Sequence, residues 1–318
     1  MFDFPPLPDL PASDRAAAPL PLRYEDVTQD GRVRLEAVPP ALGPACWWPL
    51  LSEHPISSLT RDLGVVPILN RMVIEAGGGP ISVYDPLSAR GALALGHTRD
   101  GQGRVDRIVL QLFADLHGVL GRTYGPAPEG AGERVRVGRV YAEHVFTRPF
   151  GAPGERKVLE LPEGYGLPRV PERELRWRVP ESVQTPPEGA RLLDREAQPG
   201  RRVRFGLAHT DSNQHVNSLS YVRLFEEAAI SRLGEHDRSE PSLGTHLELA
   251  YRKPSFAGEE LDLSVLAFTL PRGIPRAEGE IEDRRAETGA QTHGAVGSIG
   301  PKHGKGRAHC FFRLVAKT

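Results

Sequence analysis

The order of elements in residues 201–318 constrains the fold of this chain more than any other feature of its sequence. RVRFGLAH reads as a strand, and the next segment, VNSLSYVRLFEEAAISRLG, carries apolar residues at helical spacing. Four runs of strand character follow this helix: THLELAYRKP, ELDLSVLAFTL, GAVGSIG and RAHCFFRLV. This order predicts an α+β unit in which an antiparallel sheet packs on one long helix.

Residues 21–150 repeat this order less clearly. A partly helical stretch at 45–64, interrupted by Pro49 and Pro55, precedes several runs that alternate between apolar and polar residues. Before it, the Asp-Gly pair between LRYEDV and RVRLEAV predicts a hairpin over 22–38. A strand, a helix and then antiparallel strands are the element order of a hotdog fold. Two copies predict a double hotdog of class α+β, with antiparallel sheets each wrapped around a central helix.

The distribution of proline and glycine, 30 and 34 residues, predicts the boundaries between the copies. Residues 1–20 read as a proline-rich N-terminal arm that is extended unless it packs on the body. The segment 151–200 is dense in proline and charge, and we interpret it as the connection between domains. An N-terminal hotdog-like domain is therefore expected over 21–150, and a C-terminal hotdog domain over 201–318.

Charge and cysteine content exclude several classes of protein. The 40 basic and 41 acidic residues nearly cancel, which disfavours a nucleic-acid binder or a protein held on an anionic membrane. The two cysteines, Cys46 and Cys310, form no CxxC pattern, so a disulfide scaffold and a cysteine zinc site are not expected.

The N-terminus lacks the pattern of a signal peptide, and no apolar run is long enough to span a bilayer. We expect a cytoplasmic protein.

The chemistry of the sequence is concentrated between the strand and the helix, in the nine residues His209-Thr-Asp-Ser-Asn-Gln-His-Val-Asn217. Asp211 supplies a carboxylate for a base or a nucleophile, Asn213 an amide that orients a carbonyl or a water, and His215 a group that moves protons. The helix start adds unpaired N–H groups that stabilise an oxyanion. Asp, Ser and Asn are also ordinary capping and turn residues, so a purely structural role competes for each of them taken alone.

One acid interrupts the apolar face of the predicted helix. Glu226 falls at helical spacing among Leu219, Val222, Ala229 and Leu233. A buried carboxylate needs partners or a raised pKa, so Glu226 is either a site residue or a satisfied structural carboxylate.

The segment 211–228, D-S-N-Q-H-V-N-S-L-S-Y-V-R-L-F-E-E-A, resembles the D-x-N-x-H-V-N-(N)-x-x-Y signature of the acyl-ACP thioesterases. It is also similar to the helix start of the 4-hydroxybenzoyl-CoA thioesterase-like hotdog group. The resemblance implies hydrolysis of acyl-ACP or acyl-CoA without a cofactor, with Asp211 as nucleophile or base and with Asn213 and His215 in support. It allows a homodimer of double hotdogs. Further supporting candidates are Glu226, His209, Asn217 and Tyr221.

The chain departs from this family pattern at two positions. The wider group often carries an aspartate where this chain has His209. In the plant enzymes an acid follows the Y-R-R triplet of the next strand, whereas Tyr251-Arg-Lys253 is followed here by Pro254 and Ser255. Glu226 is a hypothetical substitute for that acid.

Two other functions compete with thioester hydrolysis. Double-hotdog dehydratases pair H-x-x-x-G-x-x-x-x-P with D-x-x-x-H/Q, and this chain contains both strings, from His117 to Pro126 and from Asp211 to His215. Because His117 follows a long strand and precedes a glycine-rich turn, we interpret HGVLG as a hairpin tip.

The third hypothesis is a non-catalytic acyl-binding module in which the polar cluster only caps the helix. The remaining histidines lack metal-ligand spacing, so no metal is expected.

Overall fold

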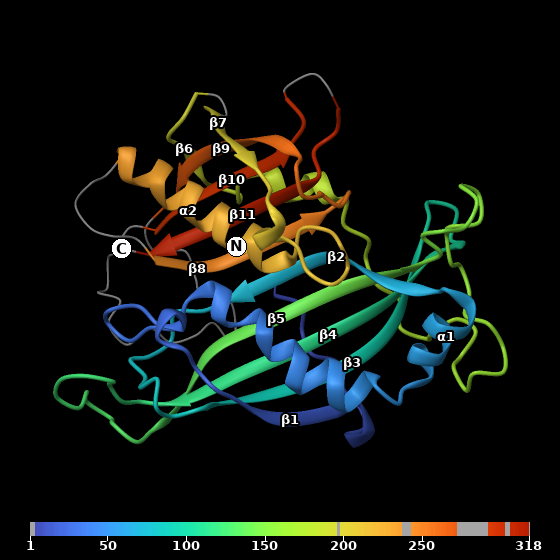
Figure 1. Cartoon of the computed structure of the whole chain (residues 1–318), viewed down its shortest axis with the longest axis horizontal. Coiled ribbons are helices and arrows are strands. Elements are labelled where there is room, and N and C mark those ends of the chain that lie inside the picture. Colours follow the sequence, from blue (N-terminus) through green and yellow to red (C-terminus); the bar gives the residue numbers. More distant parts are fainter. Residues whose placement is uncertain (1–3, 196–197, 237–242, 272–291, 303–305, 318) are drawn as a thin grey trace.

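The computed structural model describes residues 4–195, 198–236, 243–271, 292–302 and 306–317. One antiparallel sheet of eleven strands runs through the molecule in the order β1-β3-β4-β5-β2-β8-β11-β10-β9-β6, and β7 pairs with β9 beside this path (Figure 1). The strands are β1 (Arg15–Leu20), β2 (Val66–Glu75), β3 (Leu87–Arg99), β4 (Val105–Val119), β5 (Arg134–Thr147), β6 (Arg191–Leu192), β7 (Gln198–Arg204), β8 (Leu243–Tyr251), β9 (Glu260–Thr269), β10 (Thr292–Gly300) and β11 (Cys310–Lys317).

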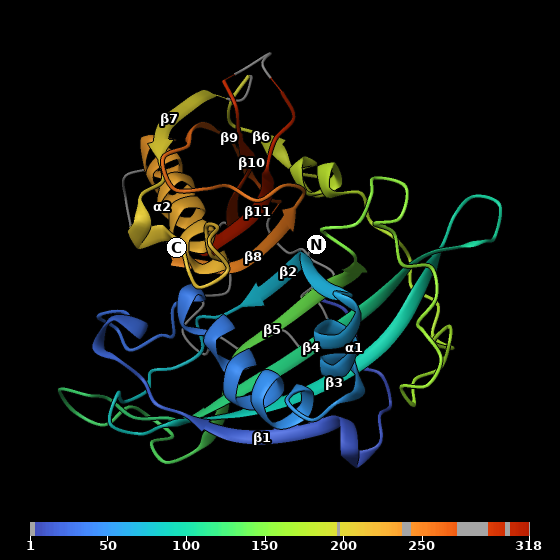
Figure 2. The same cartoon turned by 45° about the vertical axis from the view of Figure 1, so that its right-hand side comes forward.

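Helical segments pack on one face of this sheet, called the inner face below. α2 lies over the C-terminal strands, and η5 and α1 lie over the N-terminal strands on the same side (Figure 2). The longer helices are α1 (Pro55–Leu63), α2 (Ser218–His236) and the π-helix η5 (Gly43–Leu51). Short 3-10 turns are η1 (Ala12–Asp14), η2 (Tyr24–Asp26), η3 (Leu35–Ala37), η4 (Pro39–Ala41), η6 (Pro180–Gln184) and η7 (Leu207–His209).

The two halves have the same order of strands, as a double hotdog requires. The N-terminal half reads β1-β3-β4-β5-β2 and the C-terminal half reads β7-β9-β10-β11-β8 in the reverse spatial direction. β2 and β8, each the first strand after its helix, pair antiparallel from Arg71↔Ala250 to Glu75↔His246. The two expected sheets are therefore joined edge to edge into one, and neither half has an unpaired edge at the junction.

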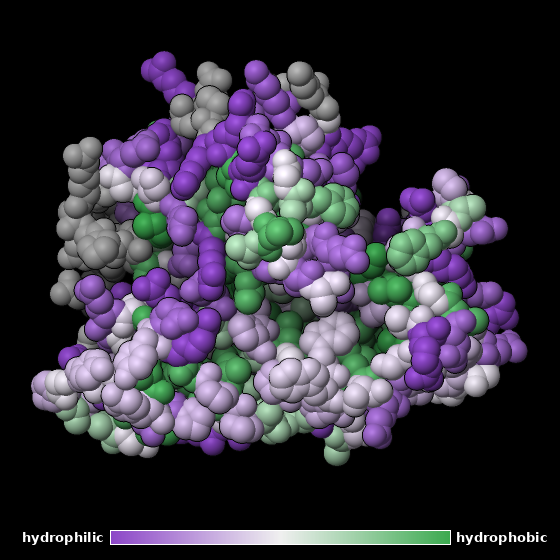
Figure 3. All heavy atoms as spheres, in the orientation of Figure 1, coloured by the Kyte–Doolittle hydropathy of each residue, from purple (hydrophilic) through white to green (hydrophobic). Residues whose placement is uncertain are grey.

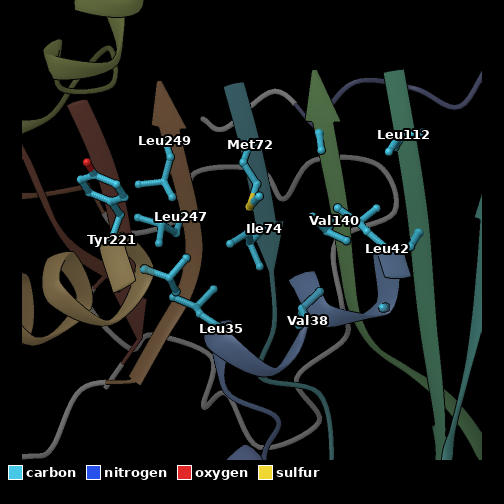
Figure 4. Packing of buried hydrophobic residues seen from close by; sticks show 14 of the residues in the cluster. Leu35, Val38, Leu42, Met72, Ile74, Leu112, Val140, Tyr221, Leu247 and Leu249 are labelled. Carbon is cyan, nitrogen blue, oxygen red and sulfur yellow. The ribbon is translucent and has the colours of Figure 1, made fainter. Parts of the chain in front are cut away.

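A single hydrophobic core crosses this junction. Leu35 and Val38, from the turns before η5, lie on the same inner face as Ile74 of β2 and Leu247 of β8 (Figure 4). Further along, the ring of Phe225 from α2 stacks on Phe312 of β11 with centroids 4.4 Å apart. Burial of apolar surface across the β2–β8 pair thus holds the two halves together.

The opposite face, called the outer face below, buries charge at the same junction. Glu248 of β8 lies between Arg71 of β2, 2.6 Å away, and Arg313 of β11. Burial alone would raise the pKa of Glu248, but the two guanidinium groups outweigh it and hold the pKa below its usual value. η6 covers part of this face and packs Val183 against Phe311.

The helical stretch of the N-terminal half differs from the expected interrupted helix. Pro49 lies inside the π-helix η5, and Pro55 is the first residue of α1, a position that tolerates a missing N–H. η5 approaches the sheet closely at Gly91, where an added Cβ would lie 2.0 Å from the carbonyl oxygen of Ala45. Packing against the sheet therefore determines this helix more than local propensity does.

Several segments differ from the sequence expectations. The predicted hairpin over 22–38 is reduced to an isolated bridge between Val27 and Val33, because the chain turns inward at η3 to bury Leu35 in the core. Among the alternating runs expected to form strands after residues 45–64, the segment 80–85 forms a turn instead. Residues 15–20 form edge strand β1, so only the part of the expected arm before this strand lies outside the sheet. None of the described helices combines the length and the apolarity that crossing a lipid bilayer requires.

Candidate functional site

The sequence motif forms an exposed turn directly before α2. Thr210 and Val216 make an isolated antiparallel bridge, and Asp211 to His215 close the turn between them. Asp211 and the next three residues are exposed to solvent. Polar side chains cover much of the face seen in Figure 3, and apolar side chains show between them.

The carboxylate of Asp211 organises this turn. Its Oδ1 accepts a hydrogen bond from the backbone N–H of Asn213 at 2.8 Å, an Asx turn. The Asp211 carbonyl accepts from the N–H of Gln214 at 2.9 Å, and Gln214 adopts a left-handed conformation with φ 64°. Within the described residues Oδ2 of Asp211 has no hydrogen bond, so one carboxylate oxygen remains available for chemistry.

The turn brings the three predicted catalytic residues together in space. His215 is half-buried, and its Nδ1 lies 3.3 Å from the carbonyl oxygen of Val216. Among the described contacts, the side chains of Asp211, Asn213 and His215 make no hydrogen bond or ion pair with one another. The site is therefore a cluster of separate polar groups rather than a preformed triad.

Asn217 and His209 have structural partners. Oδ1 of Asn217 accepts from the N–H of Ser220 at 2.9 Å, which caps the start of α2. Nδ1 of His209 accepts from the N–H of Gly206 at 2.9 Å, and its ring meets Phe205 edge-on. These contacts hold the two ends of the motif loop in place.

Below this loop lies a buried chain of hydrogen bonds that the sequence did not predict. The hydroxyl of Tyr221 donates to Oγ of Ser255 at 2.8 Å, and Oγ of Ser255 lies 2.9 Å from Nδ1 of His309. Ser255 is fully buried, and its carbonyl accepts from the N–H of Val216 in the motif loop at 2.8 Å. Nearby, the buried hydroxyl of Tyr251 has no hydrogen-bond partner within the described residues. The only signal for this chain of hydrogen bonds in the sequence was Ser255. It follows Tyr251-Arg-Lys253, where the family pattern has an acid.

Glu226 lies apart from the turn. It is the ninth residue of α2, so it lies about 12 Å along the helix axis from Ser218 at a rise of about 1.5 Å per residue. Burial raises its pKa to about 7, and the charge of Glu36 adds to this, while Arg34 and the N–H of Gly244 oppose it. Glu226 thus faces the junction between the halves, and the structure does not bring it to Asp211.

His117 lies elsewhere as well, and not at a hairpin tip. It belongs to β4 and pairs with Ser88 of β3 and Arg136 of β5. Its side chain shares the outer face with Phe113, whereas α2 packs on the inner face. His117 and the Asp211–His215 segment, the two parts of the dehydratase pattern, therefore do not lie on the same face of the sheet.

Known structures share this architecture over almost the whole chain. An acyl-ACP thioesterase from Bacteroides thetaiotaomicron is 13% identical and matches with a TM-score of 0.54 over 96% of this chain and 98% of its own. The chain has the fold of the acyl-ACP thioesterases. A protein assigned as an oleoyl thioesterase from Lactobacillus plantarum is 12% identical, with a TM-score of 0.55 over 96% of this chain and 97% of its own. The expected double hotdog is thereby confirmed.

Sequence comparison adds nothing to this likeness. No protein-family model matches the chain, and no curated protein matches it. Within the described residues no group of three or more His, Cys, Asp or Glu side chains is placed to hold a metal ion.

Proposed function

We propose that this chain hydrolyses acyl thioesters to a free acid and a thiol. The observation that carries the proposal is the place of the Asp211–His215 turn, exposed to solvent immediately before the central helix of the second hotdog. A structure named as an acyl-ACP thioesterase has the same double fold over nearly its full length. The resemblance of residues 211–228 to the signature of that family supports the same conclusion from the sequence.

Asp211 is the proposed reactive group, in one of two roles. As a base, its carboxylate takes a proton from a water whose oxygen adds to the thioester carbon. The tetrahedral intermediate then expels the thiolate, which takes up a proton as the thiol leaves. As a nucleophile, the carboxylate displaces the thiolate to form a mixed anhydride, which water then cleaves to the acid and the regenerated carboxylate. The Asx turn fixes Oδ1 and leaves Oδ2 for either step.

Asn213 and His215 are proposed to support this step. The exposed amide of Asn213 can orient the thioester carbonyl or the water, and His215 can protonate the departing thiolate. The first-turn N–H groups of α2 cannot be paired within the helix, and they provide donors for the developing oxyanion. The cap from Asn217 occupies the N–H of Ser220, which leaves those of Ser218 and Leu219 for this role.

The substrate is proposed to be an acyl-ACP or an acyl-CoA. Both carry the same thioester on a phosphopantetheine arm, so the proposed chemistry at the turn is identical for the two. A panel of acyl-ACP and acyl-CoA substrates, scored for released thiol, separates them by kcat/KM.

The variant Asp211→Asn tests the mechanism. Asparagine retains an Oδ1 acceptor for the Asx turn but removes the carboxylate, so we expect a folded protein that releases no thiol. Ser212→Ala, in the same exposed turn, is the matched control and should keep full activity. Unchanged turnover in Asp211→Asn contradicts the proposed role. Unaltered acyl ligand bound to the wild-type protein without turnover would favour the acyl-binding module instead.

A further inference from the structure

The turn that carries Asp211 is tied to the rest of the fold by a single hydrogen bond. Within the described residues, the other hydrogen bonds of 210–216, including the Asx turn at Asp211, stay inside the segment 206–220. Only the backbone N–H of Val216 reaches a different part of the chain, and it donates to the carbonyl oxygen of Ser255 at 2.8 Å. The position of the exposed turn therefore depends on the position of Ser255.

Ser255 is itself held from two sides. The hydroxyl of Tyr221 donates to its Oγ at 2.8 Å, and Nδ1 of His309 lies 2.9 Å from the same atom. Ser255, Tyr221 and His309 are 0%, 2% and 1% exposed, so water does not compete for these bonds. Because buried polar groups are costly to leave unpaired, the three side chains have one strongly favoured arrangement.

His309 connects this arrangement to the sheet. Its backbone N–H donates to the carbonyl of Ile299 in β10 at 2.8 Å, and its own carbonyl accepts from the N–H of Arg252, directly after β8, at 2.8 Å. Burial lowers the pKa of His309, and the charge of Lys253 lowers it further against the opposing effect of Glu259. The ring is therefore neutral at pH 7, and its Nδ1 can pair with a hydroxyl in either tautomer.

Tyr221 connects the same arrangement to the helix. It is the fourth residue of α2, and its ring lies beside Leu249 on the inner face (Figure 4). The ring meets Phe205 and Tyr251 edge-on, with centroids 5.8 Å and 5.6 Å away. Ser255 thus joins the first turn of α2 to the end of the motif turn. This contact sets where the first-turn N–H groups lie relative to Asp211.

Ser255, His309 and Glu259 have the residue types of a serine triad but not its geometry. In such a triad the serine and the acid face different nitrogens of the histidine. Here Oε2 of Glu259 lies 4.0 Å from Nδ1 of His309, the nitrogen that also faces Ser255. The serine is fully buried, so no substrate reaches its Oγ. The geometry favours a positioning role over a nucleophilic one.

We propose that Ser255 is a positioning residue for the reaction at Asp211. Its carbonyl holds the turn through Val216, and its hydroxyl keeps that carbonyl in place. The inference rests on the proposed thioester hydrolysis at Asp211. Because a misplacement of about 1 Å can cost about 100-fold in rate, loss of this anchor should lower kcat more than it weakens substrate binding.

The variant Ser255→Ala tests this role by two measurements on the full-length chain. The first is amide hydrogen exchange at Val216, where protection should fall at least about tenfold, because the carbonyl that holds this N–H is no longer fixed. The second is turnover of the panel thioester that the wild type hydrolyses fastest. We expect kcat to fall about 10- to 100-fold and KM to change less than about threefold. A residue needed only for global stability would change neither quantity at a temperature where both proteins are folded.

Two further variants sharpen the test. Tyr221→Phe keeps the ring but removes one bond to Ser255, so it should give smaller losses of the same two kinds. It also keeps the proposal testable if Ser255→Ala does not fold. Ser264→Ala is the matched control, because its hydroxyl also lies 3.3 Å from a partner, the carbonyl of Ser298, but in β9. It should leave exchange at Val216 and turnover unchanged.

Two results would overturn the proposal. Unchanged protection of Val216 in both Ser255→Ala and Tyr221→Phe would mean that the serine hydroxyl does not hold the turn. Lost protection with unchanged kcat would mean that the turn reacts without this anchor. A wild type that hydrolyses no thioester of the panel contradicts the proposed function instead, and exchange at Val216 still decides whether Ser255 anchors the turn.

Discussion

The side-chain oxygen of Ser255 lies 2.9 Å from Nδ1 of His309, although 54 residues separate them and both are buried. Tyr221 donates to the same oxygen, so Ser255 links two buried side chains through one hydroxyl group. The serine thus connects the first turn of α2 to the residue before β11. Through its carbonyl it also holds Val216 of the motif loop.

Replacement of Ser255 by alanine should destabilise the protein and loosen the loop. It leaves the Tyr221 hydroxyl and the His309 nitrogen buried without partners, and each such group costs about 1–3 kcal/mol. Urea unfolding measures the loss, and Ser255→Cys, with a weak donor of similar size, should fall between alanine and the wild type. Ser212→Ala, in the exposed turn, should change the free energy of unfolding by less than about 0.5 kcal/mol. Equal stability of the two alanine variants would contradict a structural role for the chain of hydrogen bonds.

The raised pKa of Glu226, about 7, makes stability depend on pH in the direction opposite to that of a paired carboxylate. The folded state holds this proton more tightly than the unfolded chain, whose carboxyl has its ordinary pKa near 4.5. The stabilisation that the folded state gains from holding this proton is therefore fully present below about pH 4.5, and it is lost as the pH rises through 7. Relative to Glu226→Gln, the wild type should lose up to a few kcal/mol of stability between pH 5 and pH 8.

Urea unfolding of both proteins at the two pH values measures this difference. Glu227→Gln, on the exposed side of the same helix, controls for the general effect of pH on the chain. A constant difference between Glu226→Gln and the wild type would show that the folded state does not hold this proton.

The buried charges at the junction predict a large effect of removing one partner. Glu248→Gln leaves Arg71 and Arg313 without their shared carboxylate, in a region where all three side chains are buried or nearly so. Breaking a buried ion pair in this way costs about 3–5 kcal/mol. Because the pair joins β2 to β8, thermal unfolding should also become less cooperative, as the halves separate before each unfolds. Arg61→Ala, which breaks an exposed pair with Asp62, should cost at most about 1 kcal/mol.

The sequence predicted the C-terminal half more accurately than the N-terminal half for a physical reason. The helix expected over 216–234 is α2 at 218–236, because its apolar spacing and the cap at Asn217 are both local signals. η5 depends instead on the close contact of Ala45 with Gly91, which lies 46 residues later in the chain. No local pattern predicts that Pro49 can lie inside such a helix.

The candidate site also has one part that the sequence could predict and one part that it could not. The turn at Asp211 could be predicted because its residues are adjacent in the sequence and make their hydrogen bonds to one another. The partnership of Ser255 with His309 could not be predicted, because it depends on the register of β8 and β11, in which Tyr251 faces Cys310.

Gly91 provides the sharpest test of the packing of η5. In Gly91→Ala the new methyl group would lie 2.0 Å from the carbonyl oxygen of Ala45 and 2.7 Å from Sγ of Cys46, so the π-helix must move away from the sheet. Overpacking of this kind typically costs about 1–3 kcal/mol, and contact with a backbone atom favours the upper end of that range. Gly101→Ala, at a turn with no atom within 4 Å of the new Cβ, is the matched control and should be nearly neutral. Urea unfolding compares the two, and equal stability would mean that η5 can retreat from β3 without loss.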